Sequence, residues 1–257
     1  MNEQAQKKQP VVSLGVMCGD AHAGAPLERC LRSVLEKTNG CPVDEVVIGF
    51  NGKAADVVEG TIKRFGYFCV DRDEFERPIA QGNANVVAAQ IATGRGITNW
   101  GSTAIYKRPK LKLVCFEWPG RFDVARNQYW SHLTGEWLLA LDADDVLTDT
   151  ATPEGLKAVQ DIERDYGLAP LAGENAAPVP LQQWLASLPV NINVIFIGYD
   201  YKIDEQGYVV VRQKSKRLVR RSLGHIWHSP DESGVHEQLT PVGAVPENSI
   251  SNLGILL

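Results

Sequence analysis

Three carboxylates gather at the end of one short apolar stretch of this sequence. The segment "GEWLLALDADDVLTD" (135–149) places four apolar residues directly before Asp142, Asp144 and Asp145. Two carboxylates about 5 Å apart repel each other by about 3 kcal/mol at an effective dielectric near 20. Water, a raised pKa or a bound cation could offset that repulsion. Alternation along an extended backbone predicts that Asp142 and Asp144 point the same way and that Asp145 points toward solvent or caps the next helix.

A second candidate group lies about ninety residues further along the chain. "VHE" (235–237) contains His236, which could bind a metal or a phosphate, and Glu237, which could act as a general base. His225 and His228 are competing metal ligands, and Trp227 is expected to pack in the interior. The basic run "RQKSKRLVRR" (212–221) fits either an anion-binding patch or a charged edge strand equally well.

The elements around these residues predict an α/β fold. Apolar β-rich runs alternate with amphipathic helical patterns in the first part of the chain, and this predicts a parallel sheet covered by helices. The expected strands are 11–18, 44–50, 110–118 and the apolar stretch 136–147, and the expected helices are 27–38, 54–66, 122–135 and 152–167. The stretch 71–110 reads as an excursion over the sheet, and 168–180 as a linker or loop.

The texture of the sequence changes in the last third. Residues 190–204, 208–213 and 216–221 read as antiparallel strands, the first two joined around "EQG". We therefore expect one mixed sheet with a parallel front half and antiparallel strands toward the C-terminus. A single domain over 1–257 is expected, with one functional half at 11–150 and another at 185–245.

Composition narrows the functional classes. The 257 residues carry a net charge of −5, so global charge does not indicate binding to nucleic acid or to an anionic membrane. No apolar run is long enough for a membrane span, and the polar N-terminal segment shows no signal peptide. Five widely spaced cysteines without a C-x-x-C pair fit a reducing compartment, so a cytoplasmic location is expected.

Four stretches, in order, resemble the family 2 glycosyltransferases of the GT-A fold. They are "VSLGVMC" followed by "LERCLRSVLEKT", then "VVIGFNGKAAD", then "FDVARNQYWSHLTGEWLLALDADDVL", and last "RLVRRSLGHIWHSPDESGVHEQL". The resemblance covers about residues 11–240. It implies a Rossmann-like mixed sheet and transfer of a sugar, with inversion, from a nucleotide diphosphate sugar to an acceptor hydroxyl. A UDP- or GDP-sugar donor and a Mn²⁺ or Mg²⁺ cofactor are implied, while the acceptor stays open.

The resemblance also implies roles for particular residues. Glu237 would be the catalytic base, and Asp144 and His236 would bind the metal. The residues implied to border the nucleotide sugar are Cys18, Gly19, Asp20, Asn51, Arg126, Asp142 and Asp144. The segment "FNG" (50–52) departs from the family, which usually has an Asp at or beside this position.

Other classes stay open. "LALDADDV" also fits the D-x-D-x-[TV] signature of haloacid-dehalogenase-type phosphatases, although that motif normally opens the fold and here two strand–helix units precede it. A nucleotidyltransferase would use paired aspartates, but "GDAHAGAP" lacks the basic residue expected in its first loop. A non-catalytic sugar- or protein-binding relative of the same fold is the remaining alternative.

Overall fold

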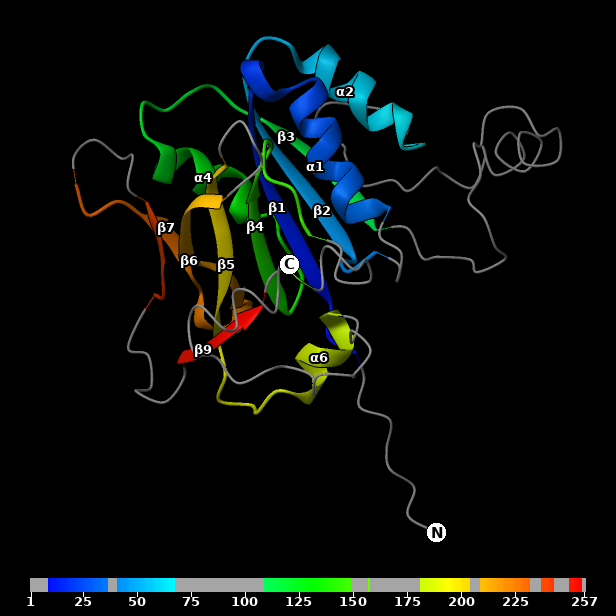
Figure 1. Cartoon of the computed structure of the whole chain (residues 1–257). Helices are drawn as coiled ribbons and strands as arrows, with labels where there is room; N and C mark the ends of the chain where they lie inside the picture. The colour runs from blue at the N-terminus through cyan, green and yellow to red at the C-terminus, as the bar shows by residue number, and fades with distance from the viewer. Residues whose placement is uncertain are drawn as a thin grey trace, which may run out of the picture.

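A mixed seven-stranded sheet forms the centre of the molecule (Figure 1). The computed structural model describes residues 9–36, 41–67, 109–148, 157, 181–203, 209–231, 237–242 and 250–255. The strand order is β3-β2-β1-β4-β6-β5-β9. The strands are β1 (Val12–Gly19), β2 (Glu45–Asn51), β3 (Lys110–Cys115), β4 (Trp137–Asp142), β5 (Val194–Ile203), β6 (Val209–Arg220) and β9 (Ile250–Ile255).

The predicted fold class is confirmed. Strands β3, β2, β1 and β4 are parallel, and β6 runs antiparallel to both β4 and β5. Strand β9 pairs parallel with β5 at the C-terminal edge, a pairing that the sequence pattern did not predict. Among the described residues, no helix combines the length and the apolar composition that a membrane crossing requires.

The two faces of the sheet are covered by different helices, because alternate residues of each buried strand point to opposite faces. One face packs against α1 (Ala25–Leu35), α2 (Ala55–Arg64) and α6 (Leu181–Ser187) through residues such as Leu14 and Ile48. The other face packs against α4 (Phe122–Trp130) through residues such as Met17 and Val47. Strand β1 is buried along nearly its whole length, as expected for a central parallel strand.

Helix α4 packs against the sheet at two glycines, Gly15 and Gly49, which lie beneath the ring of Tyr129. A Cβ atom at Gly49 would lie 2.0 Å from Cδ1 of Tyr129, and a Cβ at Gly15 would lie 2.8 Å from Cε2 of the same ring. Both positions therefore need glycine for the Tyr129 ring to fit. Outside the main sheet, β7 (Ile226–His228) and β8 (Gln238–Thr240) form an antiparallel pair, with β7 beside α4 (Figure 1).

Two sequence interpretations of the C-terminal part are wrong. The segments 208–213 and 216–221 were expected as separate strands, but 209–220 is one continuous strand. That strand lies between β4 and β5, and its residues 218–220 pair with β4, so the edge-strand alternative does not hold for this end of the basic run. The expected helix at 152–167, of which only Lys157 is described and helical, the excursion at 71–110 and the linker at 168–180 lie almost entirely outside the described residues.

Candidate functional site

The residues predicted to bind a ligand lie at the carboxyl edge of the parallel strands. Gly19 at the end of β1 pairs with Asn51 at the end of β2, and Met17 pairs with Asp142 at the end of β4. Ligands of open α/β sheets bind outside this edge. The structure therefore brings the strand-end residues of the sequence prediction to one side of the sheet.

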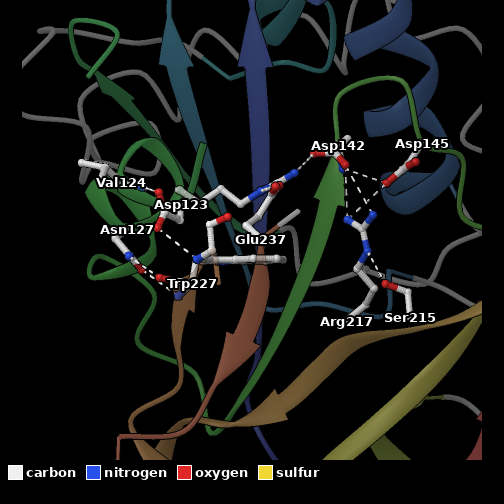
Figure 2. Close-up of polar contacts among 11 residues, drawn as sticks. Asp123, Val124, Asn127, Asp142, Asp145, Ser215, Arg217, Trp227 and Glu237 are labelled. Atoms are coloured by element: carbon white, nitrogen blue, oxygen red, sulfur yellow. Dashed lines mark hydrogen bonds and ion pairs between the residues drawn. The ribbon is translucent and has the colours of Figure 1, made fainter. Parts of the chain in front are cut away.

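Asp142 is held by two arginines rather than left to repel its neighbours (Figure 2). Its Oδ1 lies 2.8 Å from Nη2 of Arg126, and its Oδ2 lies 3.3 Å from Nη1 of Arg217. Burial acts to raise the pKa of Asp142, but the two guanidinium groups outweigh it and hold the pKa below its ordinary value. The repulsion within the acidic cluster is thus offset by arginine.

Asp145 belongs to the same cluster, contrary to the sequence prediction. Its Oδ2 accepts a 2.7 Å hydrogen bond from the backbone N–H of Asp142 and lies 3.7 Å from Nη1 of Arg217. The side chain is buried. The strand ends at Asp142 and the backbone turns there, with the N–H of Asp145 donating to the carbonyl of Asp142, so strict alternation does not extend past that residue.

Asp144 points elsewhere, so the predicted common direction of Asp142 and Asp144 is wrong. Its side chain is 57% exposed, and its Oδ2 lies 3.9 Å from Nε2 of His22 in the short helix η1 (Asp20–His22). Among the residues that the structure describes, no group of three or more His, Cys, Asp or Glu side chains could hold a metal ion by itself. The predicted ligand His236 lies outside the described residues.

Arg126 connects the acidic strand end to the predicted base. The side chain is 7% exposed, and its Nε donates a 2.7 Å hydrogen bond to Oε1 of Glu237 while Nη2 pairs with Asp142. The guanidinium also stacks over Trp227, with its Cζ 4.6 Å from the ring centroid. Burial opposes the charge, but Asp142, Tyr129 and Glu237 raise the pKa of Arg126 above its ordinary value. The phosphate contact implied for Arg126 stays a prediction, since the observed partners are carboxylates.

Glu237 lies just before β8, and its side chain is 10% exposed. The strand β7 that pairs with β8 is bound to α4 by Asn127. The Nδ2 of Asn127 donates to the carbonyl of Trp227, and its Oδ1 accepts from the N–H of Trp227 (Figure 2). The side chain of Asn127 is therefore bound to the backbone of β7 and not to its own helix. Trp227 is buried, which confirms its predicted packing role.

Asp20 is used differently from the implied nucleotide contact. Its carboxylate accepts hydrogen bonds from the backbone N–H groups of Lys53 and Ala54, at 2.8 Å from Oδ1 in each case. These bonds, that from Ala54 first, lower the pKa of Asp20. A Cβ at Gly52 would lie 2.3 Å from Oδ1 of Asp20, so glycine is needed there. Asp20 therefore stabilises the turn that follows Asn51. The nucleotide contact implied for Asp20 stays a prediction.

Cys18 is an inert thiol in this setting. Burial, followed by the nearby charges of Asp20 and Asp144, raises the pKa of Cys18 to about 12. Any contribution of residues 18 and 19 to a ligand would therefore come from the backbone. His225 is also buried, and burial lowers its pKa to about 4, while His228 is exposed. Neither histidine belongs to a metal-binding group among the described residues.

Two residues of the site were missed in the sequence. Arg217 was noted only as part of the basic run, whose function as an anion patch or an edge strand was left open. His22 stands in the loop after the first strand and was not singled out. Arg217 directly precedes the segment of β6 that pairs with β4, and adjacent strands place such a residue beside a strand end, so this position could have suggested it.

Comparison with known proteins gives only distant similarity. No family model and no curated protein matches the sequence. Among solved structures, S. aureus TarS is 12% identical with a TM-score of 0.37, and the match covers 83% of this chain and 29% of TarS. TarS 1–349 in complex with UDP-GlcNAc is 16% identical with a TM-score of 0.28, covering 66% of this chain and 37% of that one.

HddC from Yersinia pseudotuberculosis is also similar, at 9% identity and a TM-score of 0.29, covering 81% of this chain and 73% of HddC. This chain spans less than a third of the full TarS chain. At such identities and TM-scores the function has to be argued from the site itself.

Proposed function

We propose that the protein is a glycosyltransferase of the GT-A type that transfers a sugar from a nucleotide diphosphate sugar to an acceptor hydroxyl, with inversion. One observation carries the proposal. The buried guanidinium of Arg126 joins Asp142, at the carboxyl end of a parallel strand, to the carboxylate of Glu237 from the C-terminal part of the chain. A ligand-binding sheet edge and a carboxylate suited to proton transfer are therefore parts of one connected group.

Glu237 has the chemistry that the transfer needs. Its Oε1 is bound by Arg126, and its Oε2 forms no hydrogen bond with the residues that the structure describes. Oε2 would take the proton from the acceptor hydroxyl as the acceptor oxygen forms a bond to C1 of the sugar. The bond from C1 to the diphosphate oxygen breaks in the same step, and the nucleotide diphosphate leaves. Arg126 keeps the carboxylate oriented while this proton moves.

The charge of the site favours a cation beside the donor. Four carboxylates of the cluster (Asp142, Asp144, Asp145 and Glu237) face two arginines (Arg126 and Arg217), so these six side chains leave two negative charges. A diphosphate would be repelled unless a cation accompanied it. Mg²⁺ is commonly bound by one or two carboxylates together with substrate phosphates.

Asp144 fits such a cation, because its carboxylate is exposed at the sheet edge and engages no arginine among the described residues. His22, whose Nε2 lies 3.9 Å from that carboxylate, could supply a nitrogen ligand beside it. A bound Mn²⁺ or Mg²⁺ would supply neutralisation of the charge that develops on the leaving diphosphate. Asp142, which is fixed by Arg126 and Arg217, is suited to accept hydrogen bonds from the ribose.

The test is release of nucleotide diphosphate from a panel of UDP- and GDP-sugars by the purified protein, with and without Mn²⁺. We expect slow release with one donor even without an acceptor, because water can take the acceptor's place. Asp144→Ala should abolish the Mn²⁺-dependent release. Glu237→Gln should lower turnover about 10²-fold or more and leave the affinity for the nucleotide diphosphate unchanged.

Glu136→Gln is the matched control. Glu136 also pairs with an arginine, Arg220, but its side chain is 52% exposed and lies at the opposite end of β4. It should keep full turnover. Binding of a nucleotide sugar without turnover would favour a non-catalytic binding protein instead, and absence of binding to every donor would refute the proposal.

A further inference from the structure

One face of α4 binds the backbone of the chain segment that leads to Glu237. Oδ2 of Asp123 accepts a 3.0 Å hydrogen bond from the N–H of Ser229. Asn127 pairs with both backbone groups of Trp227, at 2.8 Å and 2.9 Å. The Nε1 of Trp130 donates a 2.9 Å hydrogen bond to the carbonyl of His225. We call these four bonds the α4–β7 contacts.

The three side chains of α4 that make these contacts are spaced along the helix at nearly the same intervals as their backbone partners along the strand. Asp123, Asn127 and Trp130 stand at positions i, i+4 and i+7, which share one face of a helix and span about 10.5 Å along its axis. Their partners are alternate residues of an extended segment, which span about 13 Å. Because the helix runs in the opposite direction to the strand, each side chain meets one backbone position in turn, with the Asn127 pair at the centre.

The bound segment places Glu237. Trp227 pairs with Leu239 and His228 pairs with Gln238 in the β7–β8 pair, and Glu237 directly precedes β8. Arg126, on the same helix between Asp123 and Asn127, binds the Glu237 carboxylate itself. The helix therefore acts on Glu237 twice, by an ion pair to its side chain and by backbone contacts to the strand beside it.

We propose that Asn127 is a positioning residue for Glu237: its side-chain amide substitutes for a neighbouring strand at Trp227 and thereby fixes the β7–β8 pair that carries the base. This inference rests on the proposed function of Glu237. Among the described residues, Asn127 forms hydrogen bonds with the backbone of Trp227 and none with Glu237. Its loss would leave the Arg126 contact in place but free the strand pair to shift against α4. A misplacement of a catalytic group by about 1 Å can cost about 10²-fold in rate.

The experiment measures nucleotide diphosphate release by Asn127→Ala, with Gln128→Ala as the control from the exposed side of the same helix. We expect kcat to fall about 10²-fold in Asn127→Ala while the affinity for the nucleotide diphosphate stays unchanged, and Gln128→Ala to behave as the unmodified protein. Rates are divided by the concentration of nucleotide-binding protein, so partial unfolding does not count as lost turnover. Trp130→Phe removes one outer contact but keeps the ring's packing, and it should show a smaller loss of kcat.

A double-mutant cycle separates positioning from a merely structural role. If Asn127 acts through Glu237, then Asn127→Ala in a Glu237→Gln background should cause no further loss of kcat. Additive losses, or full kcat in both Asn127→Ala and Trp130→Phe, would overturn the inference. In that case turnover by the unmodified protein and its loss in Glu237→Gln would leave the proposed function intact. Absence of turnover in the unmodified protein would refute the proposed function, and the positioning role with it.

Discussion

The two sides of the candidate site are positioned by different means. Asp142 is placed by the main chain of β4, a strand in the middle of the sheet with partners on both sides. Glu237 is placed by side chains of α4, which reach across to a strand pair outside the main sheet. The Asp142 side of the site thus depends on sheet formation, whereas the Glu237 side depends on a few individual polar contacts.

Because of this difference, the positions of Asp142 and Glu237 should respond differently to substitutions in the elements around them. A central strand is held by many backbone hydrogen bonds, so no single side chain determines where it ends. The β7–β8 pair has three residues in each strand, and a two-stranded pair alone is marginally stable. Substitutions in α4 should therefore displace Glu237 more easily than substitutions in neighbouring strands displace Asp142. Arg126, which contacts both sides, is the exception.

The largest effect is expected from Arg126→Met. Removal of the guanidinium leaves the carboxylates of Asp142, 27% exposed, and Glu237, 10% exposed, without it, and breaking a largely buried ion pair from one side costs about 3–5 kcal/mol. The free energy of unfolding from urea titration measures this loss. Arg32→Met is the matched control, because Arg32 also pairs with two carboxylates, Glu28 and Glu36, but is 53% exposed, so its loss should cost less than about 1 kcal/mol. Equal losses in the two variants would contradict the buried role.

A smaller effect is expected from Gly49→Ala, which tests how α4 sits on the sheet. The new methyl group would overlap the Tyr129 ring, and such overpacking costs about 1–3 kcal/mol. The helix would have to lift, so turnover should fall together with the free energy of unfolding. Gly60→Ala in α2 is the control. A Cβ there meets nothing within 4 Å, and the change should stabilise the protein by about 0.5–1 kcal/mol. Unchanged stability of Gly49→Ala would show that α4 has room to move.

The smallest effect is expected from Asp123→Asn, and it depends on pH. Hydrogen bonds from Arg121 first, with those from Ser229 and Val124, hold the pKa of Asp123 at about 2, below its ordinary value. The ionised carboxylate therefore stabilises the fold above about pH 4, and this contribution is lost as the pH falls toward 2.

Asp123→Asn should lower the free energy of unfolding by about 1 kcal/mol at pH 7, and the difference from the unmodified protein should shrink between pH 4 and pH 2. Urea titrations across that range measure it. A difference that stays constant with pH would show that the carboxylate charge has no part in holding Ser229.

The sequence predicted the sheet better than the site. Strand and helix periodicities are local, so the parallel front half and α4 could be predicted, along with the acids at the end of β4. The partners of those acids could not. Arg217 is 75 residues from Asp142, and Arg126 is 111 residues from Glu237. Nothing in a local pattern shows that these charges meet, so the arginine partners of Asp142 could not be predicted.

The contacts of Asn127 were harder still to predict. They join a side chain to backbone atoms 100 residues away. Nearly every residue has the same backbone N–H and C=O groups, so the sequence does not indicate which of them a side chain binds. The predicted side-chain directions of Asp144 and Asp145 were wrong for another reason. The alternation rule applies only while the chain stays extended, and the turn after Asp142 ends it.

Side chains of α4 bind β7 through the backbone atoms of that strand. The two outward-facing side chains of β7 therefore take no part in these contacts. Ile226 and His228 are exposed on either side of the buried Trp227. Their identities could change during evolution without altering the backbone contacts that hold β7 against α4. Related chains could therefore differ in the exposed side chains of β7 while α4 keeps the same contacts with its backbone.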